Sequence, residues 1–235
     1  MKVITIACLS FCAVFCAAMP AYSQSGAKNG EWTAYGGDSG NTRYAPLDQI
    51  TPDNFSKLQV AWRFKTENLG PRPEFNLEGT PLMAKGILYS TVGTRRAVVA
   101  LDAATGELLW THSENEGARG TNAPRQLSGR GLAYWSEGNE ERILYVTPGY
   151  RLIALNAKTG IPVPSFGKNG AIDLKEDDDQ VIDPITGEVG LHATPMVAKD
   201  VVIIGAAHRP GGVPGSAEDS ENRCPRRTPA ANPPR

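Results

Sequence analysis

An all-β propeller is the fold class that this sequence of 235 residues predicts, and an internal repeat is the main reason. The strand and turn at 97–106 (AVVALDAATG) return at 151–160 (RLIALNAKTG), and each copy follows an Ile-Leu-Tyr triplet, at 87–89 and 143–145. Repeats of roughly 40–55 residues built from short strands and Thr-Gly turns are typical of propeller blades. Two unrelated hairpins are the alternative, but they would not explain why the strand repeats together with the turn.

The elements can be justified in chain order. A polar, glycine-rich leading segment runs from 24 to 44, and the period-two alternation of Leu58–Phe64 predicts a strand. A third unit begins like the first, because TPMVAK at 194–199 copies TPLMAK at 80–85. The repeats therefore predict strands over 80–89, 97–102 and 107–112 in the first unit, over 131–135, 142–147 and 151–156 in the second, and over 194–205 in the third.

Three regions are expected. Residues 1–23 read as a signal peptide, with Lys2, an apolar core and a small-x-small site before Gln24, so we expect a periplasmic protein. Residues 24–214 form a partial propeller of about three blades, the last incomplete. Residues 215–235, rich in Gly, Pro and Arg, predict a disordered tail of the kind that a frameshift or premature stop produces.

Charge and cysteine content narrow the classes of partner. The formal net charge of −1 does not indicate nucleic acid or an anionic membrane as a partner. Three of the four cysteines fall in the expected signal peptide, which leaves Cys224 alone. We therefore expect no intrachain disulfide in the exported protein.

Two strand ends carry residues suited to ligand binding. Glu78 precedes the strand that begins near Thr80, and Arg130 lies between Gly129 and Gly131 ahead of the next unit. An arginine framed by glycines suits bidentate binding of a carboxylate or phosphate. From the spacing alone, Arg130 could equally well be an ordinary surface arginine in a turn.

Three motifs together carry a family resemblance. They are the leading pattern W-T-x-Y-G-G-D-x-x-x-T-R-Y-x-P-L-x-Q-I at 32–50, the D-x-x-T-G-x-x-x-W repeat at 102–110, and R-G-L-A-Y at 130–134. From about Glu31 to Pro214 the chain resembles the pyrroloquinoline quinone (PQQ) dependent dehydrogenases, and within them the glucose dehydrogenase type. The resemblance implies a periplasmic eight-bladed propeller that oxidises an aldose sugar or an alcohol by hydride transfer to PQQ.

The same resemblance implies roles for five residues. Glu78 matches a glutamate that contacts the quinone, and Arg130 matches an arginine that pairs with a quinone carboxylate. His192 falls at a position that contacts a cofactor carboxylate, while Ala207 and His208 border the quinone. Ca²⁺ is the implied second cofactor, and a cytochrome c or a membrane quinone is the implied electron acceptor.

Departures from the family pattern limit these expectations. Pro124 and Arg125 stand where the methanol-oxidising branch has a vicinal Cys-Cys, and Pro210 stands where that branch has a calcium-ligating glutamate. The family's catalytic aspartate lies in later blades, so we assign no catalytic or metal-binding residue and expect little or no turnover from this chain. A non-catalytic propeller scaffold of the cell envelope is the alternative; Glu78 with Arg130, and the lack of a lipidation motif, favour the enzyme family.

Overall fold

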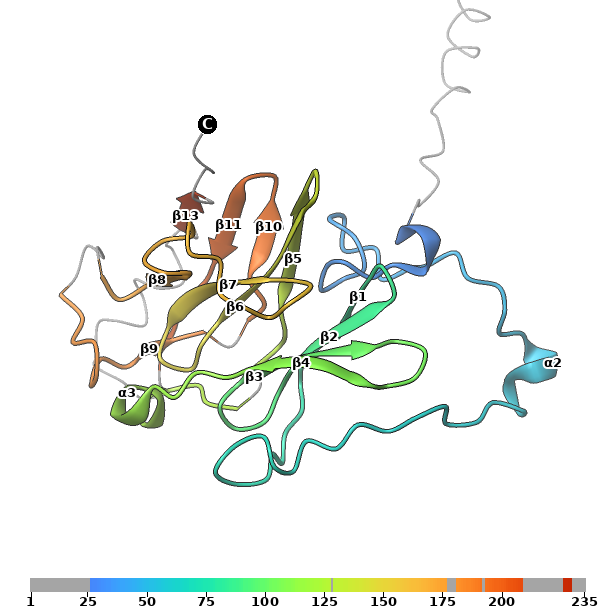
Figure 1. Cartoon of the computed structure of the whole chain (residues 1–235), viewed down its shortest axis with the longest axis horizontal. Coiled ribbons are helices and arrows are strands. Elements are labelled where there is room, and N and C mark those ends of the chain that lie inside the picture. The colour runs from blue at the N-terminus through green and yellow to red at the C-terminus, as the bar shows by residue number, and fades with distance from the viewer. Residues whose placement is uncertain (1–25, 128, 177–180, 192, 209–225, 230–235) are drawn as a thin grey trace, which may run out of the picture.

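Two four-stranded antiparallel sheets of the same design form the centre of the structure, a computed structural model (Figure 1). It describes residues 26–127, 129–176, 181–191, 193–208 and 226–229. The predicted signal peptide at 1–23 and most of the predicted tail lie outside these ranges. Each sheet consists of four strands that are consecutive along the chain and paired in that order, which is the arrangement of a propeller blade and confirms the predicted fold class.

The strands have the following bounds. The first sheet contains β1 (Leu82–Ala84), β2 (Ile87–Val92), β3 (Ala97–Asp102) and β4 (Leu108–His112). The second contains β5 (Ala133–Glu137), β6 (Glu140–Val146), β7 (Arg151–Asn156) and β8 (Ala171–Asp173). The third unit contributes β9 (Val189–Gly190), β10 (Met196–Ala198), β11 (Val201–Ile204), β12 (Ala207–His208) and β13 (Arg226–Pro229). The helical segments are short: η1 (Lys28–Gly30), α2 (Pro52–Phe55) and α3 (Gly117–Thr121).

The repeated turn has the same geometry in both sheets. Asp102 Oδ1 accepts a hydrogen bond from the backbone N–H of Thr105 at 2.8 Å, and Asn156 Oδ1 accepts one from that of Thr159 at 3.2 Å. A third copy, which was not predicted from the sequence, lies at Asp183–Gly187, where Asp183 Oδ1 accepts a hydrogen bond from the backbone N–H of Thr186 at 2.6 Å. These Asx turns satisfy backbone donors locally, and the first two end β3 and β7 at a fixed point.

A tryptophan packs on each of the two repeated turns. A Cβ at Gly106 would lie 2.5 Å from the ring of Trp62, and a Cβ at Gly160 would lie 2.5 Å from the ring of Trp110. Trp110 Nε1 also donates to the carbonyl of Ala157 at 3.0 Å, so the last strand of the first sheet is attached to the second sheet. The positive φ of both glycines, +75° and +69°, is a second reason for glycine at these positions.

Two regions differ from the sequence prediction. Leu58–Phe64 is not a strand: Trp62 and Phe64 pack against the first sheet, but Leu58 and Val60 are exposed and no described strand pairs with this segment. A period-two pattern cannot form a strand without a neighbour to accept its backbone hydrogen bonds. Conversely, part of the expected disordered tail, Arg226–Pro229, forms β13 beside β11.

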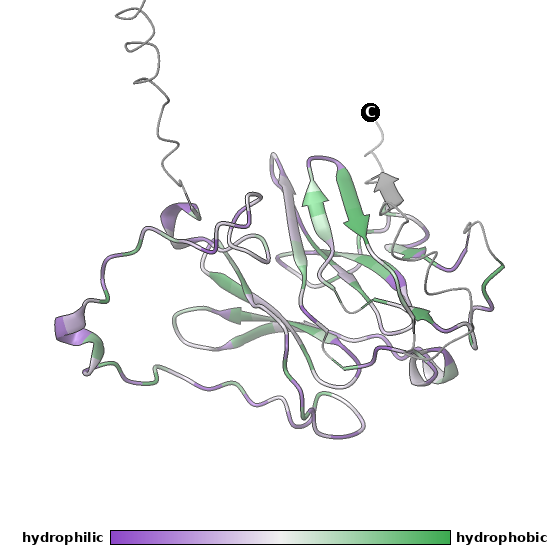
Figure 2. Ribbon diagram, turned by 180° about the vertical axis from the view of Figure 1, so that it is seen from behind, coloured by the Kyte–Doolittle hydropathy of each residue, from purple (hydrophilic) through white to green (hydrophobic). Residues whose placement is uncertain are grey.

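Three clusters of buried apolar side chains lie between successive layers. One lies between the first and second sheets, a second between the second sheet and the third unit, and a third between the first sheet and the segment around Trp62. Figure 2 shows the apolar colouring concentrated on the strands rather than on the connecting segments. None of the helices in the described ranges has the length and apolar character needed to cross a bilayer.

Candidate functional site

A hollow of about 370 Å³ lies between the loops that precede β1 and β5. Its volume is within the range of roughly 300–1,000 Å³ found for small-molecule sites. Five polar or charged residues and three apolar residues from the two loops line it: Arg72, Asn76, Glu78, Ala123, Pro124, Arg125, Gln126 and Leu127.

The backbone joins the starts of the three inner strands at this end of the molecule. The N–H of Thr80 donates to the carbonyl of Arg130 at 3.0 Å, and Thr80 forms a parallel bridge with Gly131. Thr194 Oγ1 donates to the same carbonyl at 3.1 Å. The Thr-Pro pairs that open the first and third units therefore meet at Arg130, because the repeat places them at equivalent points of their sheets.

The predicted site residues fall into three groups. Glu78 lines the hollow and accepts a hydrogen bond from Asn76 Nδ2 at 2.9 Å. Arg130 is exposed beside it but does not belong to the lining of the hollow. Ala207 and His208 form β12, which pairs with β9, whereas His192 lies outside the described residues.

The glycines on either side of Arg130 lie close to other parts of the protein. A Cβ at Gly129 would lie 3.0 Å from Nε of Arg96, and a Cβ at Gly131 would lie 2.9 Å from the carbonyl oxygen of Thr80. These two glycines therefore allow Arg96 and the first inner strand to come close.

Arg96, in the turn between β2 and β3, was not identified from the sequence. Its guanidinium is buried and donates to the carbonyls of Leu127, Val146, Leu191 and Arg125 at 2.9 to 3.0 Å. Burial lowers the pKa of Arg96 to about 10, so the group stays protonated at neutral pH. The only available signal was an arginine pair placed directly before an apolar strand, which by itself does not distinguish a buried from an exposed side chain.

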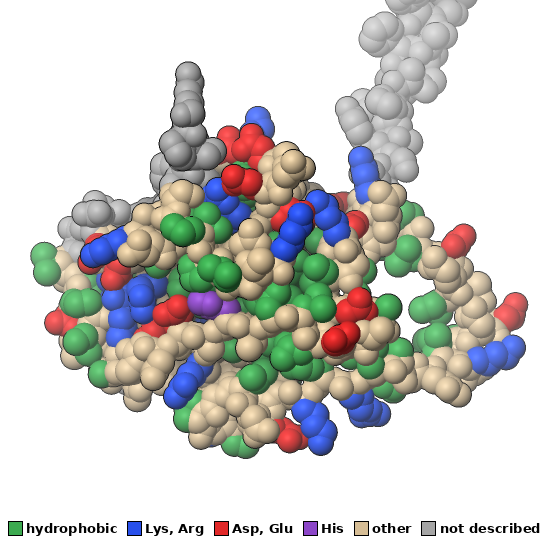
Figure 3. Space-filling model, viewed as in Figure 1, with side chains coloured by type: hydrophobic (Ala, Val, Ile, Leu, Met, Phe, Trp, Pro, Cys, Tyr) green, Lys and Arg blue, Asp and Glu red, His purple; other side chains and the backbone are tan. Residues whose placement is uncertain are grey.

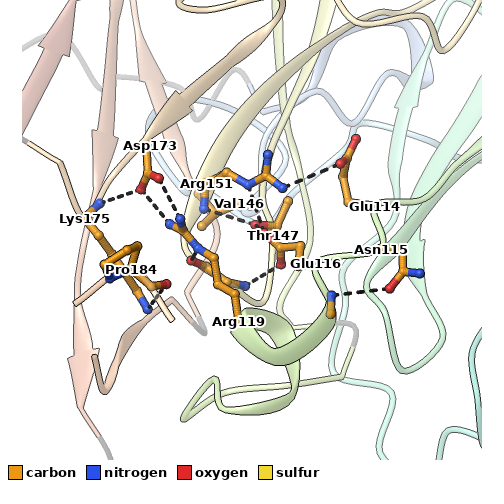
Figure 4. Close-up of polar contacts among 12 residues, drawn as sticks. Glu114, Asn115, Glu116, Arg119, Val146, Thr147, Arg151, Asp173, Lys175 and Pro184 are labelled. Atoms are coloured by element: carbon orange, nitrogen blue, oxygen red, sulfur yellow. Dashed lines mark hydrogen bonds and ion pairs between the residues drawn. The ribbon is translucent and has the colours of Figure 1, made fainter. Parts of the chain in front are cut away.

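A second polar cluster attaches the segment around α3 to the second sheet (Figure 4). Glu116, with a side chain only 2% exposed, accepts hydrogen bonds from Thr147 Oγ1 at 2.8 Å and from Arg151 Nε at 3.1 Å. Arg119 binds Asp173 through two hydrogen bonds of 2.6 Å. Burial raises the pKa of Asp173, but the hydrogen bonds from Arg119 and its charge outweigh this effect and bring it below its usual value.

This cluster continues on both sides. Glu114 contacts His112 at 3.0 Å, and the buried Lys175 donates to the carbonyl of Gly187 at 2.9 Å. Figure 3 shows basic and acidic side chains gathered near β8 and above α3 on this face. The pairing anchors the start of the segment whose end, at 123–127, lines the hollow.

The described residues do not by themselves fit a calcium ion. In the part of the chain that the structure describes, no three His, Cys, Asp or Glu side chains come together as a metal site. The hollow does suit part of an anionic organic molecule, because two arginines line it and Nε of Arg125 is buried with no hydrogen-bond partner among the described residues.

The stacked blades and the polar loops at the starts of their inner strands define a β-propeller domain with a site at one end. The chain belongs to the PQQ-dependent dehydrogenases: residues 32–220 match the family described as the PQQ glucose/ethanol/alcohol dehydrogenase β-propeller domain. This confirms the family predicted from the sequence motifs.

Individual relatives agree with this assignment. The chain is 33% identical to the glycerol dehydrogenase large subunit of Gluconobacter thailandicus over 80% of its own length and 26% of the relative's, and 34% identical to the 1-butanol dehydrogenase (cytochrome c) of Thauera butanivorans over 83% and 28%. The crystal structure of quinohemoprotein alcohol dehydrogenase from Comamonas testosteroni superposes with a TM-score of 0.59 and 27% identity, covering 79% of this chain and 24% of that one. The chain thus spans about a quarter of the length of the curated relatives it matches.

Proposed function

We propose that this chain provides one wall of the PQQ site of an exported dehydrogenase that oxidises an alcohol, a polyol or an aldose sugar. The observation that carries the proposal is that Glu78 lines the hollow while Arg130, on the neighbouring loop, is tied by its carbonyl to Thr80. Two residues that the family resemblance assigns to the cofactor thus lie on adjoining loops. The relatives named as glycerol and 1-butanol dehydrogenases favour alcohols and polyols over sugars as substrates.

Each residue would have a limited task. When bound, PQQ supplies a two-electron acceptor for the hydride that leaves the carbon carrying the substrate hydroxyl. Glu78, oriented by Asn76, offers a carboxylate to the edge of the ligand. Arg130 supplies a positive charge for a ligand carboxylate, and the hydrogen bonds from Thr80 and Thr194 to its carbonyl fix its backbone.

The cellular setting follows from the same assignment. We propose export to the periplasm through the segment 1–23, and electron transfer to a cytochrome c or a membrane quinone. The name of the Thauera butanivorans relative, which specifies cytochrome c, supports the first of these acceptors. Ca²⁺ is proposed as the second cofactor on family grounds alone.

Binding rather than turnover is the appropriate test, because the chain supplies only part of a pocket. The purified chain would be titrated with PQQ by calorimetry, with and without Ca²⁺. Arg130→Met should weaken PQQ binding by about 1.5–3 kcal/mol, the range for a hydrogen bond to a charged group, and Glu78→Gln should weaken it to a smaller extent.

Glu137→Gln is the matched control for Glu78→Gln, because Glu137 is exposed at the hairpin end of β5, away from the hollow. Its PQQ affinity should equal that of the unmodified chain. Failure of the unmodified chain to bind PQQ, under conditions in which it is folded by circular dichroism, would favour the non-catalytic scaffold instead.

A further inference from the structure

The hollow between the loops 72–78 and 123–127 carries an excess of positive charge. Its lining residues include two arginines, Arg72 and Arg125, against one acidic residue, Glu78. The guanidinium of Arg72 lies 5.3 Å from the centre of the Phe75 ring, which holds it on its own wall. A recess lined mainly by one sign of charge concentrates ligands of the opposite sign.

Arg125 has unused hydrogen-bonding capacity in this lining. Its Nε is buried and has no hydrogen-bond partner among the described residues. Most buried N–H groups in proteins have an acceptor, so an exception beside a hollow indicates a missing partner. The planar guanidinium matches a carboxylate, which accepts two parallel hydrogen bonds.

The backbone that carries Arg125 is fixed from behind by Arg96. Nη2 of Arg96 donates to the carbonyl of Arg125 at 2.9 Å, and Nε donates to that of Leu127 at 3.0 Å. Its other two acceptors, the carbonyls of Val146 and Leu191, belong to the second sheet and the third unit. Arg96 therefore fixes the loop 123–127 relative to the first sheet, the second sheet and the third unit.

Arg96 also contributes charge. No described acidic side chain forms an ion pair with it within 4.0 Å, and its hydrogen bonds go to carbonyl oxygens; the charges of Glu116 and Glu74 act on it only from further away. A buried guanidinium that remains protonated at neutral pH thus stands directly behind the wall of the hollow. Such a charge is screened weakly by solvent and favours an anion on the other side of the wall.

We propose that Arg125 is a carboxylate-binding residue of this hollow and that Arg96 is the positioning residue that holds it there. The proposal rests on the proposed function for its setting and adds to it a binding group that the family motif does not contain. The carboxylate would come either from the quinone cofactor or from a hydroxy-acid substrate, and the experiment separates the two sources.

The test uses the purified chain and four probes in calorimetry. PQQ is compared with its trimethyl ester, which keeps the ring system but lacks the carboxylates, and D-gluconate is compared with neutral D-glucose. Arg125→Met should lower the affinity for PQQ or for gluconate at least tenfold, and it should leave the trimethyl ester and glucose unchanged. Arg95→Met, which removes an exposed charge from the neighbouring turn, should leave all four affinities within twofold.

A second pair of variants tests the positioning role. Arg96→Met should lower the affinity for the same carboxylate probe at least tenfold and raise hydrogen exchange in the peptide 121–130, and Arg96→Lys should restore part of both. Arg142→Met is the matched control, because Arg142 is also buried but pairs with Glu140 and stacks on Trp135 at the hairpin end of the second sheet. It should change neither the affinity nor the exchange of that peptide.

The outcomes separate this inference from the proposed function. PQQ binding that Arg125→Met leaves unchanged, with no gluconate binding, would overturn the inference while the proposed function stands. Gluconate binding that depends on Arg125, without PQQ binding, would support the inference and count against the proposed function. If Arg96→Met does not fold, the comparison of Arg125→Met with Arg95→Met decides alone.

Discussion

The two four-stranded sheets carry the same repeat but are covered differently. Leu155 of β7 faces the first sheet and is 0% exposed, whereas Leu101, at the equivalent point of β3, packs against the extended segment that contains Trp62 and Phe64. One leucine is thus enclosed by two sheets and the other by a sheet and a loop. The repeat therefore determines the strands and turns of each sheet. The neighbouring unit determines how rigidly the side chains on each face of the sheet are enclosed.

The largest expected effect comes from truncating these two leucines. Leu155→Ala should lower the free energy of unfolding by about 3 kcal/mol, because the two sheets cannot close on the cavity. Leu101→Ala should cost about 2 kcal/mol, since the segment around Trp62 can move inward. Urea unfolding followed by circular dichroism would measure both, with the half-exposed Leu109→Ala as a control that should change little. Equal losses at 101 and 155 would show that the loop packs as rigidly as a sheet.

An intermediate effect is expected at the paired turn glycines. Gly160→Ala should destabilise the chain by about 2 kcal/mol, because a Cβ there has an unfavourable φ and meets Trp110, which β4 holds in place. Gly106→Ala has the same φ cost, but Trp62 lies outside any strand and can shift, so the loss should be about 1 kcal/mol. The comparison uses the same unfolding measurement. A larger loss at Gly106 would contradict the view that the first sheet has the softer neighbour.

The smallest effect concerns acid stability of the two turns. Hydrogen bonds from Thr105 lower the pKa of Asp102 from its usual 3.8, whereas the equivalent Asn156 does not titrate. The stabilisation from Asp102 is therefore fully present at pH values above the usual pKa of 3.8. It is lost as the pH falls through the lower pKa that Asp102 has in the folded state. The urea midpoint should drop less between about pH 7 and pH 3 in Asp102→Asn than in the unmodified chain, and more in Asn156→Asp.

The sequence predicted the repeated parts of the fold because two local signals coincide there. The apolar runs before Asp102 and Asn156 specify strands, and the Thr-Gly turns specify where they end. Leu58–Phe64 alternates in the way a strand does, but it has no described partner strand. Here a local pattern predicted the wrong element. The third turn, at Asp183, was not predicted because no long apolar run precedes it.

From the sequence, cofactor-binding residues could be proposed only through the family resemblance. Glu78 and Arg130 were proposed in this way and the structure brings their loops together, while their contact with the cofactor stays a prediction. Arg96 could not be assigned, because its importance lies in carbonyl groups of three distant segments that no sequence pattern encodes. The role of Arg125 also depends on this contact, since the sequence shows only that it departs from the family pattern.

The contacts of Arg96 impose an order on folding. Its acceptors lie 29, 31, 50 and 95 residues further along the chain, the last being Leu191. Contacts of such sequence separation form late, because a long loop must close first. The hydrogen bond from Arg96 to Leu191 can therefore form only after the second sheet and the start of the third unit have been synthesised. The first sheet has its complete set of contacts only once these later units have joined it.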